Sequence, residues 1–182
     1  MPTKKPLTIL PANQLLQQIW DYIISRPGKK GETKKSQWEC LYLLCWKAGL
    51  RISEAISFDL NLEHGESEYK GLYFLRGKRQ KDRWVYLSPE IAKELRKRNW
   101  KPNNANRINF FYFLQQVKKE LNIAENIELA PHSLRRCFAT YNALNGMPLP
   151  VLQKVLGHSK ISTTALYIKD SDLSNLVKFK PI

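Results

Sequence analysis

The sequence predicts a mainly α-helical fold that carries one small antiparallel β-sheet, an α+β arrangement. Along most of the 182 residues, apolar side chains recur every three or four positions, which is the period of an amphipathic helix. Residues 71–87 instead contain an apolar and aromatic run, a polar basic turn, and then Trp84 and Tyr86 alternating with Val85 and Leu87, a pattern typical of a β-hairpin. With 43% hydrophobic residues, a chain of this length forms one globular domain with a satellite element, or at most two small domains.

Two amphipathic helices are expected in the first quarter of the chain. The apolar face of the first comprises Leu15, Leu16, Ile19, Tyr22 and Ile23. The apolar face of the second comprises Trp38, Leu41, Tyr42, Cys45 and Trp46. The Gly- and Lys-rich segment 25–35 links the two helices, and Gly49 ends the second. A short helix is expected within residues 51–58, followed by an extended segment over residues 59–65.

The hairpin is the only sheet that the sequence indicates with clarity. Its turn is centred on "GKRQKD", residues 77–82. A helix then begins with Ser88 as its cap and Pro89 at its first position, and another is expected over residues 108–121. The final third is helical, with breaks over residues 146–150 and at Gly157.

Charge composition points to a polyanionic partner. Lys and Arg number 30 against 16 Asp and Glu, a formal net charge of +14. Nucleic acid and anionic membranes both fit this sign, but no apolar stretch approaches the ~20 residues of a membrane-spanning helix, and no signal peptide precedes "MPTKKP". A cytoplasmic, nucleoid-associated protein is therefore expected. Cys40, Cys45 and Cys137 lack the spacing of metal ligands, so we expect buried thiols and no metal site.

Residues 132–167 gather chemistry-bearing side chains at helix ends. His132 and Arg135 lie three positions apart at a predicted helix start, where the dipole, free N–H groups and a guanidinium all favour a phosphate; a solvated basic turn is the alternative. Gly157 places His158 just beyond a helix end, where a structural histidine is also ordinary. Tyr167 follows nine residues later, and a tyrosine at helical spacing most often packs in a core.

Together, "AGLRISEA", "HSLRR" and "LGHSKISTTALY" resemble the boxes of the tyrosine recombinase (phage integrase) family, in the same order. The match runs from residue 7 to residue 168 and covers that family's catalytic domain. By resemblance, Arg51 and Arg135 bind the scissile phosphate, His132 and His158 are its proton-transfer or hydrogen-bonding partners, and Tyr167 is the nucleophile.

By the same resemblance, the hairpin supplies the general acid. Lys78 in "RGKRQKDR" matches that position, and Lys81 is the second choice. Glu54 lies three residues after Arg51 and either orients its guanidinium or forms a plain surface ion pair. Two departures are present, since Arg136 and Cys137 stand where the family often has histidine and threonine.

The resemblance implies a site-specific DNA recombinase or integrase that works through a 3′-phosphotyrosyl intermediate, without metal, ATP or other cofactor. Two arginines can neutralise the phosphate bidentately, and a phenolate can both attack phosphorus and leave again. Double-stranded DNA is the expected partner, with self-association into a dimer or tetramer on it. The alternatives are a non-catalytic DNA-binding module and a relaxing activity like that of type IB topoisomerases.

The domain expectation is a single catalytic domain over residues 1–182, with residues 7–168 as the family-like core. The family's N-terminal DNA-clamping domain is expected to be absent. The tail, residues 169–182, either docks on a neighbouring protomer or packs back on its own domain.

Overall fold

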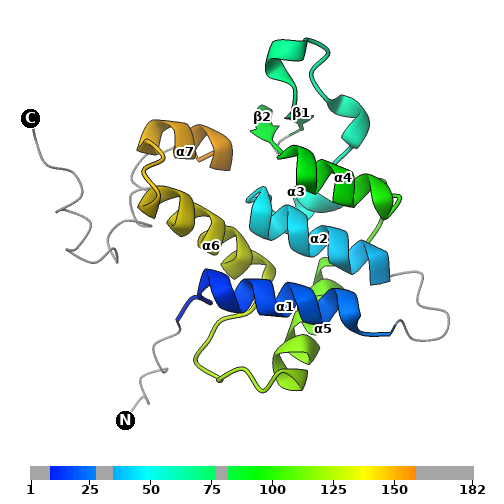
Figure 1. Ribbon diagram of the computed structural model, residues 1–182, viewed down its shortest axis with the longest axis vertical. Coiled ribbons are helices and arrows are strands. Elements are labelled where there is room, and N and C mark those ends of the chain that lie inside the picture. Colours follow the sequence, from blue (N-terminus) through cyan, green and yellow to red (C-terminus); the bar gives the residue numbers. More distant parts are fainter. Residues whose placement is uncertain (1–8, 28–34, 77–81, 159–182) are drawn as a thin grey trace, which may run out of the picture.

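The computed structural model describes residues 9–27, 35–76 and 82–158, and within them it shows a mostly helical domain with a two-stranded antiparallel sheet (Figure 1). The predicted fold class is confirmed. The elements in chain order are α1 (Asn13–Ser25), α2 (Lys35–Lys47), α3 (Ile52–Ile56), the 3₁₀ turns η1 (Leu60–Leu62) and η2 (Ser67–Tyr69), β1 (Leu72–Leu75), β2 (Arg83–Tyr86), α4 (Pro89–Lys97), α5 (Arg107–Glu120), α6 (Pro131–Leu144) and α7 (Leu149–Leu156).

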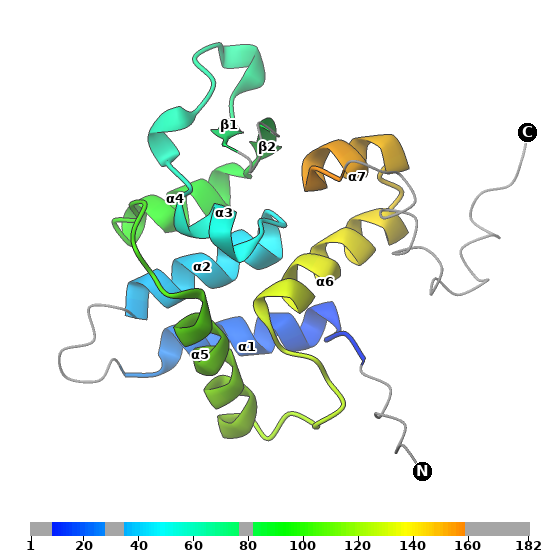
Figure 2. The same cartoon turned by 180° about the vertical axis from the view of Figure 1, so that it is seen from behind.

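Helix α2 forms the centre of the core. It packs against α1, α3, α4 and α6, and Figure 2 shows it between α1 and α4. Every residue from Trp38 to Trp46 is buried, Glu39 included. The predicted single apolar face is therefore wrong for this helix, because neighbours cover it on several sides. For α1 the prediction is confirmed, since Leu16, Ile19 and Ile23 are fully buried.

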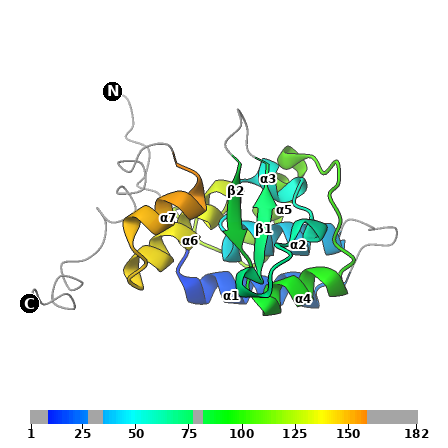
Figure 3. The ribbon, with the colours of Figure 1, turned by 90° about the horizontal axis from the view of Figure 1, so that it is seen from above.

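The predicted hairpin is confirmed by its two strands. Leu72 pairs with Tyr86 and Leu75 with Arg83 in an antiparallel register. The inward face, which includes Tyr73 and Val85, is buried in the core, whereas Tyr86 on the other face is 56% exposed, as the alternation of a strand requires. Figure 3 shows α7 lying beside β2, which brings the C-terminal end of α7 close to the strand.

Local side-chain bonds set several helix boundaries. The Ser88 hydroxyl accepts a hydrogen bond from the Ile91 N–H at the start of α4, and Pro131 occupies the first turn of α6, as predicted. The extended segment expected after α3 is interrupted, because the Asp59 carboxylate accepts from the Asn61 N–H at 2.9 Å and closes the turn of η1. That part of the prediction is wrong.

The three cysteines are free and buried, as predicted. Burial raises the pKa of each of the Cys40, Cys45 and Cys137 thiols to about 12, which keeps them protonated and unreactive. Among residues 9–27, 35–76 and 82–158, no cluster of three or more His, Cys, Asp or Glu is placed to hold a metal ion. None of the helices described is both long enough and apolar enough to span a membrane.

Candidate functional site

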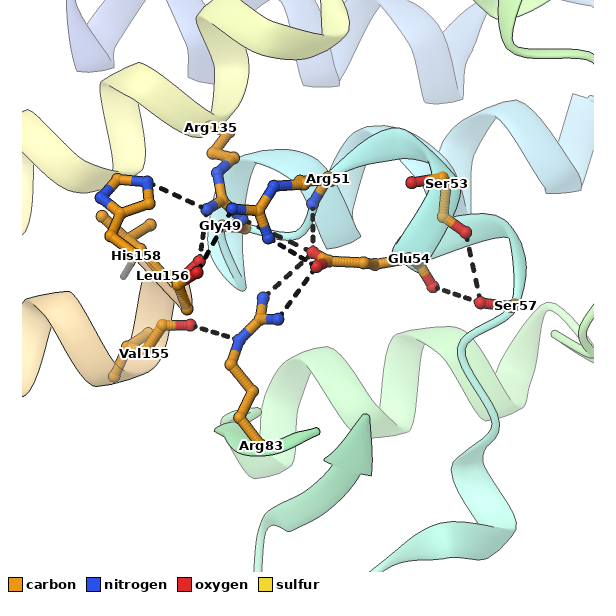
Figure 4. A network of polar contacts seen from close by, with 11 residues as sticks. Gly49, Arg51, Ser53, Glu54, Ser57, Arg83, Arg135, Val155, Leu156 and His158 are labelled. Carbon is orange, nitrogen blue, oxygen red and sulfur yellow. Dashed lines mark hydrogen bonds and ion pairs between the residues drawn. The ribbon is translucent and has the colours of Figure 1, made fainter. Parts of the chain in front are cut away.

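Three segments far apart in the sequence meet at one carboxylate. Arg51 comes from the start of α3, Arg83 from β2 and Arg135 from α6, and Figure 4 shows their three guanidinium groups around Glu54. We call Arg51, Arg83 and Arg135 the arginine cluster. His158, directly after α7, lies against Arg135 at the edge of the cluster.

Arg51 is the most accessible member of the cluster. Its side chain is 42% exposed, while its backbone N–H and its Nη1 donate to the two Glu54 oxygens at 2.8 and 2.7 Å. Its Nη2 lies 3.4 Å from the carbonyl oxygen of Gly157. The guanidinium is thus anchored on one side and open to solvent on the other.

The turn before Arg51 needs a glycine. Gly49 has φ +64°, and a Cβ atom there would lie 2.4 Å from the Phe138 ring of α6. The left-handed backbone ends α2, and the missing side chain lets α6 approach. Gly49 therefore brings the start of α3 and the first turns of α6 together.

Arg135 is buried, with 2% of its surface exposed. Its Nη1 donates to the Gly49 carbonyl at 2.7 Å and its Nη2 to the Leu156 carbonyl at 2.5 Å. Nη1 also lies 3.5 Å from a Glu54 oxygen. The alternative of a solvated basic turn is therefore wrong for Arg135, although His132 in the same turn is exposed.

Glu54 is buried, and this rules out the surface ion pair that its sequence position also allowed. Burial alone raises its pKa, but hydrogen bonds and charge from Arg83, followed by hydrogen bonds from Arg51, outweigh burial and lower the pKa to about 2. The carboxylate is ionised at neutral pH. Three guanidinium groups and one carboxylate leave two net positive charges at this site.

Both histidines of the site are held neutral. Burial, followed by the charges of Arg135, Arg51 and Arg83, lowers the pKa of His158 to about 4. Partial burial of the ring, followed by the charges of Arg136 and Arg135, also lowers the pKa of His132, although the residue as a whole is exposed. His158 Nε2 lies 3.3 Å from Arg135 Nη2, and since a guanidinium only donates, this nitrogen is the acceptor.

The corner after α7 fixes where His158 lies. Gly157 adopts the predicted left-handed conformation, with φ +62° and ψ +43°. The His158 N–H donates to the Gln153 carbonyl, and the His158 carbonyl accepts from the Gln153 side chain at 3.0 Å. A cavity of about 600 Å³ beside this corner is lined on its other side by Asp82 and Arg83.

Arg83 is the member of the site that the motifs did not identify. Its three nitrogens donate to Glu54 Oε1, Glu54 Oε2 and the Val155 carbonyl, at 2.9, 3.0 and 2.9 Å. Strand alternation could have identified it. Residues two positions apart in a strand share a face, so Arg83 lies on the same inward face of β2 as buried Val85. An arginine on an inward strand face needs buried partners.

Of the six predicted site residues, the structure brings Arg51, Arg135 and His158 together. His132 lies in the same turn of α6 as Arg135. The predictions for Lys78 and Tyr167, together with the second choice Lys81, lie outside the described residues.

A helical domain with an ionised carboxylate among three arginines, and a neutral imidazole at its edge, has the charge and the hydrogen-bond donors that suit a phosphate-like anion. The chain belongs to the phage integrase family, whose sequence model matches residues 12–173. It is 30% identical over 148 residues to tyrosine recombinase XerA of Thermococcus kodakarensis, covering 71% of this chain and 49% of the relative. It is 30% identical over 167 residues to a tyrosine recombinase of Thermosipho africanus, covering 84% of this chain and 56% of that protein.

Solved structures share the fold. XerH recombinase bound to a palindromic difH substrate superimposes with a TM-score of 0.74 at 18% identity, over 94% of this chain and 52% of that one. The catalytic domain of bacteriophage HP1 integrase gives a TM-score of 0.66 at 22% identity, over 96% of each chain. The chain spans about half the length of the curated relatives it matches.

Proposed function

We propose that this chain is the catalytic domain of a site-specific DNA recombinase, cutting and rejoining double-stranded DNA through a 3′-phosphotyrosyl intermediate. The observation that carries this proposal is the meeting of Arg51, Arg135 and His158 at one site with two net positive charges. The family match and the relatives named as recombinases support it. Related structures, such as Tn1549 transposon integrase in complex with transposon right end DNA, support DNA as the partner.

Arg51 and Arg135 provide the electrostatic part of the reaction. In-line displacement at phosphorus builds negative charge on the non-bridging oxygens. Arg51 offers the accessible guanidinium, and Arg135 offers donors already oriented by the Gly49 and Leu156 carbonyls. Because both groups are fixed before DNA binds, little reorganisation accompanies the reaction.

In the proposed reaction, the Tyr167 phenol oxygen attacks phosphorus and the bond from phosphorus to the 5′ oxygen breaks. Lys78 gives a proton to the departing 5′ oxygen, with Lys81 as the second choice for this role. His132 and His158 are neutral, as their lowered pKa values require, so an imidazole is available to accept the phenol proton. Religation reverses these steps, and the ester linkage conserves the energy of the broken bond.

The remaining assignments belong to the same proposal. We expect one catalytic domain over residues 1–182, self-association as a dimer or tetramer on DNA, and a cytoplasmic, nucleoid-associated location. No cofactor is needed for the steps above.

The test is an adduct assay on nicked duplexes. The nick lets the short fragment that carries the released 5′-hydroxyl diffuse away. The protein–DNA ester then cannot religate, so it accumulates and survives denaturing detergent. Wild-type protein should form this adduct, and Tyr167→Phe, which removes only the nucleophilic oxygen, should form none. The target sequence is found by screening a pool of nicked duplexes for the adduct.

Three outcomes would contradict the proposal. An adduct formed equally by Tyr167→Phe would exclude Tyr167 as the nucleophile. Tight DNA binding with no adduct on any duplex would indicate a binding module without catalysis. Relaxation of supercoiled DNA without exchange between paired sites would assign a topoisomerase-like activity in place of recombination.

A further inference from the structure

We propose that Arg83 is a positioning residue for the strand-transfer reaction, holding Glu54 and the C-terminal end of α7 so that Arg51, Arg135 and His158 face the DNA phosphate. This inference rests on the proposed function. It assigns a role to a side chain that donates to Glu54 and to the Val155 carbonyl, neither of which is a predicted catalytic residue.

The Arg83 guanidinium is engaged with the protein and not with solvent. Its side chain is 9% exposed, against 42% for Arg51. Each of its nitrogens already donates to a protein acceptor. Its planar fork spans both oxygens of Glu54, a geometry that a lysine ammonium does not reproduce.

The pairing with Arg83 sets how strongly Glu54 binds the other two arginines. Glu54 Oε1 accepts from both Arg83 and Arg51, and Glu54 Oε2 accepts from Arg83 while lying 3.5 Å from Arg135. Without Arg83, one carboxylate would face only two guanidinium groups. It would bind both more tightly, and the net charge left for a phosphate would fall from two to one.

The second bond of Arg83 reaches the helix that ends at His158. Arg83 Nε donates to the Val155 carbonyl, and Arg135 donates to the next carbonyl, that of Leu156. These carbonyls lie in the last turn of α7, where backbone acceptors lack partners within the helix. A Cβ atom on Gly157 would lie 2.9 Å from Arg83 Nη1, so the corner that carries His158 is packed directly against this guanidinium.

The hairpin thereby becomes part of the site. Arg83 opens β2, and β2 pairs with β1 and packs beside α7. A bond from the first residue of β2 to Glu54 and to α7 therefore locks the hairpin, α3 and α7 in one arrangement. Positioning errors of about 1 Å cost on the order of 100-fold in rate, which sets the scale expected when this bond is removed.

The first experiment compares Arg83→Gln with a matched control, Arg98→Gln. Arg98 is also a largely buried arginine, 13% exposed, that binds two carboxylates, those of Glu39 and Glu94. Single-turnover adduct formation on a nicked duplex and DNA affinity are measured separately. Arg83→Gln should slow adduct formation about 100-fold with little change in affinity, while Arg98→Gln should change neither. Equal rate losses in the two folded variants would reduce Arg83 to a structural ion pair and overturn the proposal.

A double-mutant cycle tests whether Arg83 acts through Glu54. Residues that act as a unit show non-additive effects, so Arg83→Gln combined with Glu54→Gln should be no slower than the slower single variant. Rate losses that multiply would show that Arg83 acts independently of Glu54, and the proposal would be wrong.

A third measurement needs no DNA and so separates this proposal from the proposed function. The imidazole of His158 is titrated by NMR in wild type, Arg83→Gln and Arg98→Gln. The charged groups around this ring are Arg135, Arg51, Arg83 and His132, with Asp82 and Lys154 on the adjoining cavity. The pKa of His158 should rise from about 4 only in Arg83→Gln. An unchanged pKa would overturn the positioning role even if no duplex ever gave an adduct.

Discussion

Replacing Glu54 with glutamine should make the stability of the protein less dependent on pH. Glutamine preserves the shape of the side chain but removes the charge that pairs with the arginine cluster. The pKa of Glu54 falls from an ordinary 4.5 to about 2 in the folded protein. This difference of about 2.5 units, at about 1.36 kcal/mol each, corresponds to about 3 kcal/mol of stability at pH 7. The side chain is only 8% exposed, so solvent screening is small.

The sign follows from the lowered pKa. A carboxyl group with a depressed folded-state pKa stabilises the protein above its unfolded pKa of 4.5, and this contribution is lost as the pH falls towards about 2. Between pH 7 and pH 3.5 the free energy of unfolding of wild type should fall by about 1.4 kcal/mol from this group alone. Glu54→Gln lacks the group and should not show this loss. The difference in unfolding free energy between the two proteins should therefore be largest near pH 7 and shrink with acid.

Urea unfolding followed by tryptophan fluorescence at pH 7, 5 and 3.5 measures this difference. Glu125→Gln is the control, since Glu125 is an exposed glutamate in a turn. Its curve should run parallel to that of wild type. If Glu54→Gln also ran parallel to wild type, Glu54 would not carry a strongly lowered pKa, and the description of the cluster as a buried charge network would be refuted.

Three further predictions follow from the same contacts. Arg51→Ala should slow adduct formation by 100-fold or more. It should lower the free energy of unfolding in urea by only about 1 kcal/mol or less, because the Arg51 side chain is 42% exposed. Arg135→Ala leaves buried Glu54 and two buried carbonyls short of a partner, so it should lower the same free energy by about 3–5 kcal/mol. Gly157→Ala should lower the melting temperature more than Gly146→Ala. Both glycines have positive φ, but of the two only Gly146 has open space for a Cβ atom. Equal losses in melting temperature would show that Arg83 is not packed against the corner at Gly157. DNA affinity should fall linearly with log salt, and Arg51→Ala should reduce the slope by about 1; an unchanged slope would show that Arg51 does not contact a phosphate.

Much of this protein was determined by its sequence alone. Apolar periodicity predicted the helices of the described regions, and strand alternation predicted the hairpin, with Val85 and Tyr86 on opposite faces. A glycine at position 157 predicted the left-handed corner after α7, because few other residues adopt that backbone conformation at low cost. Three motifs in the right order predicted the family, because together they resemble the boxes of the tyrosine recombinases.

Only the tertiary structure decided how those residues act on one another. Periodicity describes one helix at a time, so it could not show that neighbours enclose α2 on several sides. Nor could it distinguish a surface ion pair at Glu54 from a buried carboxylate, because that depends on Arg83 arriving from β2 and Arg135 from α6. Burial and opposite charge fix the ionisation of Glu54 and the neutrality of His158, and both are properties of the packed chain, set by groups that lie far apart in the sequence.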